Sequence, residues 1–220
     1  MMSIHNDQFS TNQDPQYKLW NSAYAGDEYY YGSEPGPLAR RAVRYHHPNY
    51  PQGGTALDVG CGEGQDLAFL AECGYTATGI EFTAHGVIKT RRFLAERSLQ
   101  AEVVTADIRT YSFNQQFDLV LVVNTIQFLG DAASACLDRV IHAVATGGVI
   151  GLSIFAREAD QPSMQSSVFF MTLPELMERF PPDHWQMLEA SQLWQWSPRT
   201  VHKTFGKPQA FVTLIAQRIA

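Results

Sequence analysis

Short apolar runs alternate with amphipathic segments through the middle of the chain. The apolar runs have the length of strands and lie at residues 55–59, 76–80, 102–106, 117–124 and 149–155. The segments between them carry apolar residues at helical spacing and lie at residues 65–73, 83–98 and 132–145. Strands that alternate with helices of these lengths predict a parallel sheet covered by helices on both faces.

The pattern changes on both sides of this core. Residues 17–34 are rich in aromatic side chains, and residues 38–47 predict a short helix with Pro37 near its first turn. After residue 156, Thr172 and Glu175 have the spacing of a capping box, which predicts a helix up to Phe180. Two later runs, at 185–196 and 210–219, predict an antiparallel pair added at one edge, with Pro198 and Gly206 in the loop between them.

These patterns predict an α/β fold. We expect a Rossmann-like doubly wound sheet that is mostly parallel, with an antiparallel C-terminal edge and helices on both faces. No convincing linker divides the chain, so residues 1–220 are predicted to form a single domain. Its parts are predicted to be a mobile tail (1–16), an aromatic segment and helix (17–50), the α/β core (55–155), with Gly147-Gly148 as the turn into its last strand, and the C-terminal helix with its strands (156–220).

Composition narrows the classes of function. The 220 residues carry a net charge of −6, so no basic field attracts nucleic acid or anionic lipid. The three cysteines include no CxxC pair, and the seven histidines show no metal-ligand spacing, so neither a disulfide framework nor a metal site is expected. The N-terminus does not resemble a signal peptide, and no apolar run is long enough to span a membrane. We therefore expect a cytoplasmic protein without nucleic-acid or membrane partners.

The stretch Asp58-Val-Gly-Cys-Gly-Glu-Gly64 follows the first predicted strand. A strand that ends in a glycine turn and opens a helix lets backbone N–H groups approach a ligand closely. The dinucleotide fingerprint needs a glycine where Gln65 stands, and a phosphate loop needs a lysine that this turn lacks. Both of those ligand classes are therefore disfavoured.

The remaining ligand is one with an adenine, a ribose and a zwitterionic amino-acid end. Asp58 and the turn offer an acceptor and N–H donors to the amino-acid end, and Glu81, at the tip of the next strand, can accept both ribose hydroxyls. Asp107 can accept from the adenine amino group, and the Ile108 backbone can read the ring edge. Phe82 and Ile108 offer apolar faces to the ring.

These residues carry a family resemblance. Residues 56–64 resemble the first motif of class I S-adenosylmethionine-dependent methyltransferases. Gly79-Ile-Glu81, Ala106-Asp-Ile108, Phe117-Asp-Leu-Val120 and Thr146-Gly-Gly-Val149 resemble the motifs that follow, in the expected order. The resemblance covers residues 55–155 and implies S-adenosyl-L-methionine as cofactor and S-adenosyl-L-homocysteine as product. The predicted cofactor-binding residues are Asp58, Gly60, Cys61, Gly62, Gly64, Glu81, Phe82, Asp107, Ile108 and Asn124.

The flanks are similar to a narrower group. Residues 20–24, residues 31–35 and the ending at 211–218 resemble the tellurite-resistance (TehB-like) methyltransferases and their thiopurine methyltransferase relatives. This resemblance implies that the aromatic segment, with Trp20 and Tyr24, is a lid over the methyl donor. The chain departs from the group at Glu63 and at Gln65-Asp66, which leaves the substrate open.

The predicted function is transfer of a methyl group to a small-molecule acceptor by in-line displacement. Soft sulfur, selenium or tellurium nucleophiles, or other ionised groups, are the candidate acceptors, because no general base is evident in the sequence. The candidate acceptor-side residues are Tyr31, Glu34 and Arg157, and no catalytic residue is assigned. Cys61 is expected to be inert and Asp118 to be structural.

Three other classes stay open at this stage. They are a module that binds the cofactor without catalysis, a nicotinamide-dependent oxidoreductase, and a macromolecular methyltransferase. The sequence does not decide between a monomer and a homodimer.

Overall fold

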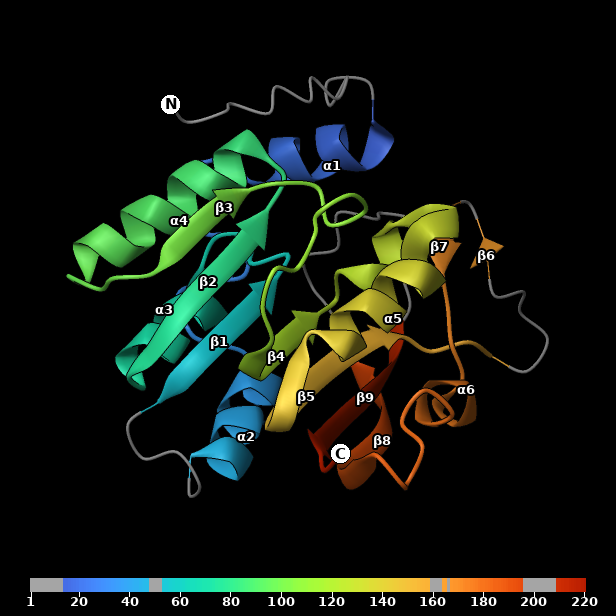
Figure 1. The fold of residues 1–220 in the computed structure, drawn as a ribbon. Coiled ribbons are helices and arrows are strands. Elements are labelled where there is room, and N and C mark those ends of the chain that lie inside the picture. The colour runs from blue at the N-terminus through green and yellow to red at the C-terminus, as the bar shows by residue number, and fades with distance from the viewer. Residues whose placement is uncertain (1–13, 48–52, 159–163, 166, 196–208) are drawn as a thin grey trace.

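The computed structural model describes residues 14–47, 53–158, 164–165, 167–195 and 209–220 (Figure 1). Most of the predicted tail, Trp196 and the loop that contains Pro198 and Gly206 lie outside these residues.

The core alternates strands and helices as the apolar pattern predicts. Its elements are β1 (Gly54–Val59), α3 (Gln65–Glu72), β2 (Tyr75–Glu81), α4 (Ala84–Glu96), β3 (Glu102–Thr105), β4 (Phe117–Val123), α5 (Ala133–His142) and β5 (Val144–Phe155). Two short 3-10 helices, η2 (Ile126–Phe128) and η3 (Gly130–Ala132), lie between β4 and α5. The predicted helix over 132–145 is therefore shorter at both ends.

One sheet organises the described residues. Its strand order is β3-β2-β1-β4-β5-β9-β8, with β1 to β5 parallel, and β9 (Gln209–Arg218) and β8 (Trp185–Gln195) antiparallel at the edge. A separate two-stranded pair joins β6 (Met164–Gln165) to β7 (Val168–Phe169). The predicted Rossmann-like sheet with an antiparallel C-terminal edge is thus confirmed.

Alternate residues of the central strands feed two apolar cores. Val120 and Val122 of β4 pack in the core on the α5 side, whereas Leu119 and Leu121 pack with α2 (Pro37–His46), α3 and α4. This is the period-two alternation of a sheet buried on both faces. The predicted helix α2 is confirmed, with Pro37 as its first residue.

Three details differ from the sequence predictions. Gly147 and Gly148 lie within β5, where the register with β4 shifts, and do not precede the strand. The capping box of Thr172 and Glu175 is present, but α6 (Leu173–Met177) ends before Phe180. Residues 14–16 are ordered, because Asp14 caps helix α1 (Pro15–Ala23) by accepting from two backbone N–H groups.

Helix α1 determines how the carboxyl edge of the sheet is covered. In Figure 1 it lies beyond the arrowheads of β2 and β3, at the edge where parallel strands present ligand-binding loops. The aromatic segment after α1 then returns towards α2. Among the described residues, no helix combines the length and the apolarity needed to cross a membrane.

Candidate functional site

The turn after β1 has a backbone that suits glycine. Gly60, Gly62 and Gly64 have φ angles of 72°, 57° and 91°, in the left-handed region that other residues rarely adopt. The N–H groups of Gly60 and Cys61 donate to the carbonyl oxygen of Ile80 at 2.8 and 3.0 Å. The turn is therefore fixed against the tip of β2, and α3 begins directly after it.

Glu81, at the end of β2, joins this turn. One carboxylate oxygen accepts from the Gly62 N–H at 3.1 Å, and the other accepts from the Thr83 N–H at 2.7 Å and the Thr83 hydroxyl at 2.5 Å. Burial raises the pKa of Glu81, while these hydrogen bonds act in the opposite direction. The structure thus brings Glu81 to the glycine turn, as the motif spacing predicts.

Asp58 is a buried carboxylate whose hydrogen bonding is incomplete. Its side chain lies at the end of β1 and the residue is only 3% exposed, yet Oδ2 has no hydrogen-bond partner among the described residues. Burial raises the pKa of Asp58 well above its ordinary value, and the charges of Asp66 and Glu81 add to the effect. Buried polar atoms almost always have partners, so this oxygen is suited to a cationic ligand group.

The loop after β3 is held by arginines. Arg109 pairs with Asp107 through two nitrogens, with distances of 2.5–2.9 Å, and also contacts Asp14 of the α1 cap at 2.6 Å. Arg139 of α5 donates to the carbonyl oxygens of Ile108 and Arg109. Asp107 and Ile108 therefore lie at the carboxyl edge as expected. The Asp107 carboxylate already accepts from Arg109, and the Ile108 carbonyl oxygen already accepts from Arg139.

The segment after β4 lies next to the glycine turn. Thr125 donates to the Val59 carbonyl oxygen at 2.9 Å, and a Cβ added to Gly60 would lie 2.3 Å from Thr125 Oγ1. Asn124 has a φ of 54° and accepts from the Ser153 hydroxyl at 3.0 Å. Two residues on from Thr125, Gln127 is fully buried, and neither atom of its carboxamide has a partner among the described residues.

Aromatic side chains from α1 and its continuation cover this edge. Trp20 packs against Phe128 of η2 and against Tyr24, with ring centroids 5.2 and 5.7 Å apart. The Tyr24 hydroxyl would lie 3.0 Å from a Cβ on Gly62, and Phe82 is in edge contact with Tyr17 at 5.7 Å. Tyr24 therefore lies beside the glycine turn with Trp20 packed against it, and their role as a lid over the methyl donor stays a prediction.

Comparison with known proteins agrees with this geometry. Residues 56–148 match a family model described as a methyltransferase domain. These residues, which are less than half of the chain, are thus similar to a methyltransferase domain.

A curated relative is similar over part of the chain. Nodulation protein S of Sinorhizobium fredii is 33% identical over 80 residues, which are 36% of this chain and 37% of the relative. The chain thus matches well under half the length of this curated relative.

Two solved structures show that the fold extends beyond the domain's motifs. The N-methyltransferase NodS from Bradyrhizobium japonicum WM9, solved with S-adenosyl-L-homocysteine, has a TM-score of 0.68 at 16% identity and covers 94% of this chain and 100% of its own. TehB from Haemophilus influenzae has a TM-score of 0.68 at 18% identity and covers 81% of this chain and 60% of its own. At these identities the likeness shows the fold alone.

The structure does not bring every predicted site residue together. Tyr31 is exposed, and Glu34 forms a surface ion pair with Arg40 of α2. Arg157 follows β5 and pairs with Glu175 of the α6 capping box. All three residues were predicted on the acceptor side. The Glu34 carboxylate is already occupied by its surface ion pair, whereas the buried Nε of Arg157 has no hydrogen-bond partner among the described residues.

Several residues of the candidate site have no local sequence signal. Arg109 bridges Asp14 and Asp107, and Lys89 of α4 is buried against Glu63 of the glycine turn. Asp118 accepts from the Thr55 N–H and hydroxyl at the far end of β1, which agrees with its predicted structural role. The thiol of Cys61 has its pKa raised by burial and by the nearby Asp58 and Glu81, which agrees with an inert cysteine.

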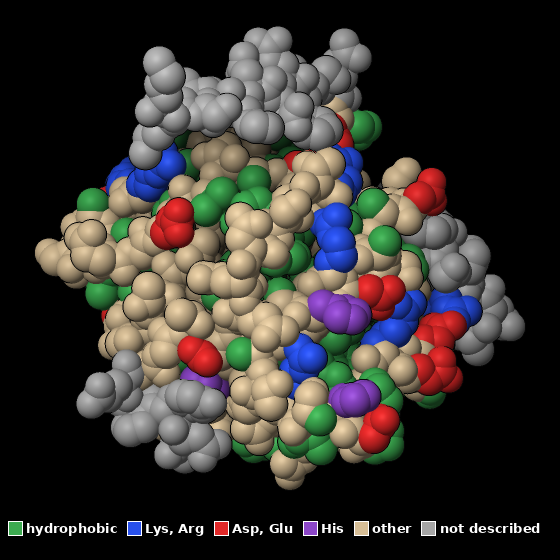
Figure 2. All heavy atoms as spheres, in the orientation of Figure 1, with side chains coloured by type: hydrophobic (Ala, Val, Ile, Leu, Met, Phe, Trp, Pro, Cys, Tyr) green, Lys and Arg blue, Asp and Glu red, His purple; other side chains and the backbone are tan. Residues whose placement is uncertain are grey.

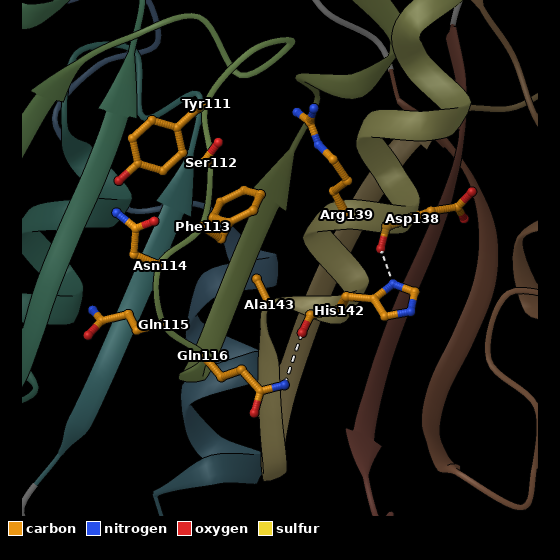
Figure 3. A pocket seen from close by; sticks show the side chains of 10 residues that line it. All are labelled: Tyr111, Ser112, Phe113, Asn114, Gln115, Gln116, Asp138, Arg139, His142 and Ala143. Atoms are coloured by element: carbon orange, nitrogen blue, oxygen red, sulfur yellow. Dashed lines mark hydrogen bonds between the residues drawn. The ribbon is translucent and has the colours of Figure 1, made fainter. Parts of the chain in front are cut away.

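A hollow of about 570 Å³ is lined by residues of the loop after β3 and of α5, and no residue of the glycine turn lines it (Figure 3). Figure 3 shows that it lies between the loop with Tyr111 and Phe113 and the side of α5 that carries Arg139 and His142. Arg139, which lines the hollow, donates to the carbonyl oxygens of Ile108 and Arg109 in the loop after β3.

Proposed function

We propose that this protein binds S-adenosylmethionine and transfers its methyl group to a small-molecule acceptor. The observation that carries the proposal is the buried Asp58 oxygen without a partner, beside a glycine turn to which Glu81 is hydrogen-bonded. A dinucleotide would bring a pyrophosphate to this turn, and an anion offers the buried Asp58 carboxyl no cationic partner. An ammonium group suits the same position.

The proposed roles follow the order of the strands. Asp58 would accept from the cofactor's ammonium group, and N–H groups of the turn from Gly60 to Gly64 would donate to its carboxylate. Glu81 would accept from the ribose hydroxyls, because each carboxylate oxygen keeps lone-pair capacity beyond its present bonds. Asp107 and Ile108 would border the adenine, and Phe82 would pack beside it.

When bound, the cofactor supplies a methyl group already activated by a sulfonium charge. The protein's own contribution is positioning, which is worth on the order of 7–11 kcal/mol in well-oriented reactions. Tyr24 would exclude water from the turn, since its hydroxyl lies beside Gly62 and Trp20 packs against its ring. Burial and the charge of Glu81 raise the pKa of Tyr24, so its hydroxyl remains neutral and does not act as a base.

For the acceptor we propose a nitrogen nucleophile of a small molecule. Support comes from the NodS structure, which is that of an N-methyltransferase, together with the nodulation protein S match. The carboxamide of Gln127, buried and without a partner at the same edge, suits an acceptor N–H. The soft sulfur, selenium or tellurium acceptors suggested by the TehB resemblance remain the competing class, since TehB shares the fold at 18% identity.

We also propose that the protein forms a single domain, is cytoplasmic and does not act on nucleic acid. Acidic and basic side chains are interspersed on the face shown in Figure 2, without a broad basic patch over the described residues. The net charge of −6 also disfavours a phosphodiester partner.

Calorimetry with S-adenosylhomocysteine tests the cofactor. We expect the wild-type protein to bind at about micromolar strength, roughly −8 kcal/mol, and Glu81→Ala to lose most of that binding. The matched control is Glu72→Ala, which removes an exposed carboxylate from α3 and should leave binding unchanged. No heat with either methyl donor or demethylated product would overturn the proposal.

Turnover separates the enzyme from a module that only binds the cofactor. Incubation with methyl-labelled S-adenosylmethionine and pooled small amines and thiols should give labelled small-molecule product. Amine products support the proposed nitrogen acceptor, whereas thioether products indicate the competing class. Label found only in protein or RNA fractions would indicate a macromolecular methyltransferase.

A further inference from the structure

The segment that follows α1, here called the strap (residues 24–36), is tied to the glycine turn by three side chains. Glu63 accepts from the Tyr30 N–H at 2.6 Å. Gln65 donates to the Gly32 carbonyl oxygen at 2.7 Å, and Asp66 accepts from the Gly36 N–H at 2.6 Å. The same short stretch that would hold the amino-acid end of the cofactor therefore also holds the strap.

The tie at Glu63 is a buried ion pair. Lys89 Nζ lies 2.7 Å from Glu63 Oε1, and the two side chains are 8% and 0% exposed. The same ammonium donates to the Glu28 carbonyl oxygen at 2.6 Å and lies 5.5 Å from the centre of the Tyr29 ring. Both partners of the pair thus contact the strap: Glu63 binds the Tyr30 N–H, and Lys89 binds the Glu28 carbonyl oxygen.

A buried ion pair of this kind is a poor stabiliser of a fold. Its desolvation penalty offsets its attraction, and apolar residues of equal volume often stabilise a core as well or better. The pair does fix geometry, because a charge that loses its partner in a buried place is strongly disfavoured. The Glu63–Lys89 pair therefore favours one closed position of the strap over partly open ones.

The closed strap lies over the turn. Tyr24 is buried, its hydroxyl would lie 3.0 Å from a Cβ on Gly62, and its ring packs against Tyr30 at 6.5 Å. A molecule whose amino-acid end occupies the glycine turn cannot enter or leave along this side while Tyr24 is in place. Exchange along this side therefore requires the strap to move away from the turn.

We propose that Glu63 is a positioning residue that, with Lys89, latches the strap over the glycine turn and so gates exchange of the cofactor. The identity of the exchanged molecule rests on the proposed function, whereas the latch itself does not.

The double variant Glu63→Gln/Lys89→Met tests the latch without leaving an unpaired buried charge. Chymotrypsin reports strap opening, because Tyr29, Tyr30 and Tyr31 are consecutive cleavage sites. In ligand-free protein we expect cleavage at these tyrosines to be about tenfold faster than in wild type, since local opening governs proteolysis. Arg91→Met is the matched control, because it removes an exposed positive charge from the same helix and should not change cleavage.

The rates of S-adenosylhomocysteine exchange, followed by stopped-flow tryptophan fluorescence, distinguish a gate from general damage. Loosening a gate should raise both the association and the dissociation rate by about tenfold, with a smaller change in Kd. Damage to the binding site would raise the dissociation rate alone. The single variant Gln65→Ala removes only the tie to Gly32, so it should move both rates in the same direction by a smaller factor even if the double variant folds poorly.

Unchanged cleavage at the three tyrosines in both variants would overturn the latch. So would faster dissociation without faster association. If wild-type protein binds no S-adenosylhomocysteine, the proposed function falls, and the cleavage comparison in ligand-free protein still decides the latch.

Discussion

The protonation state that the buried site favours for Asp58 in the ligand-free protein differs from the one that a cationic ligand would favour. Its carboxylate is buried with one oxygen unpartnered, beside the acidic groups of Asp66 and Glu81, so ionisation is disfavoured in the ligand-free protein. Burial also raises the pKa values of Asp66 and Glu81. A cationic ligand group would reverse this preference for Asp58, because an opposite charge stabilises the ionised form.

The variant Asp58→Asn tests this opposition through pH. For a carboxyl whose folded pKa is raised, the stabilising contribution is complete below the unfolded pKa of about 3.9 and is lost as pH rises through the folded value. In ligand-free protein, Asp58→Asn should therefore be more stable than wild type near pH 7, as measured by urea denaturation. The advantage should shrink as pH falls towards 4, with Asp66 and Glu81 contributing the remaining slope.

Ligand binding should show the opposite effect of the same substitution. Binding of a cation to ionised Asp58 releases a proton, so wild-type affinity for S-adenosylhomocysteine should increase between pH 5 and 7.5. Asp58→Asn should bind more weakly at pH 7.5 and show a flatter pH profile in calorimetry. A variant that binds as tightly as wild type at every pH would rule out an ammonium partner for Asp58.

At the scale of elements, the turn between β1 and α3 depends on what lies beside it. Gly60 combines a φ of 72° with a close approach to Thr125, the residue that hydrogen-bonds back to Val59. The end of β4 therefore restricts the turn that follows β1. An added methyl group at Gly60 meets both the backbone strain and this neighbour.

We expect Gly60→Ala to lower stability by about 1–3 kcal/mol from backbone strain alone, with the contact to Thr125 adding to it. The double variant Gly60→Ala/Thr125→Ala should regain the stability lost through the contact with Thr125, whereas the stability lost through the positive φ should not return. Gly26→Ala is the control, since no atom lies within 4 Å of its added Cβ. Equal melting temperatures for Gly60→Ala and Gly26→Ala would show that the turn tolerates side chains.

The elements that the sequence predicted are those with a local signal. The strands of the core, the capping box at Thr172 and the glycine turn each show a pattern within a few residues, and the order of motifs placed Glu81 beside the turn. Helix α1 was missed because none of its residues 15–23 is fully buried and their apolar periodicity is weak. It is held by contacts such as that between Asn21 and His85, which are 64 positions apart.

The same reason explains which parts of the candidate site were not predicted. Arg109 joins Asp14 to Asp107, and Lys89 reaches Glu63 across 26 positions. The partners of these pairs are too far apart in the sequence to form a local pattern. A lysine in a predicted helix is also expected to be exposed to solvent. The departure from the TehB-like pattern at Glu63 and Gln65-Asp66 was visible, but only the fold shows that these residues contact the strap.

At the scale of the whole molecule, the N-terminal segment joins loops that follow three strands of the core. The α1 cap contacts the loop after β3, the strap contacts the turn after β1, and Trp20 packs against Phe128 after β4. A ligand at the carboxyl edge would therefore contact loops that follow three strands. Such a ligand should stabilise the entire fold and not one loop.

Thermal unfolding measures this coupling and also separates the cofactor classes. At 1 mM S-adenosylhomocysteine and a Kd of about 1 μM, binding adds about 4 kcal/mol to the free energy of unfolding. For a chain of this length, about 2–4 °C per kcal/mol predicts a rise in Tm of roughly 8–16 °C. NAD at the same concentration should produce no shift, because Gln65 replaces the glycine that a dinucleotide turn needs and Asp58 would face its pyrophosphate. An equal rise in Tm with both ligands would mean that the site recognises only the adenosine that they share. A rise with NAD only would favour an oxidoreductase.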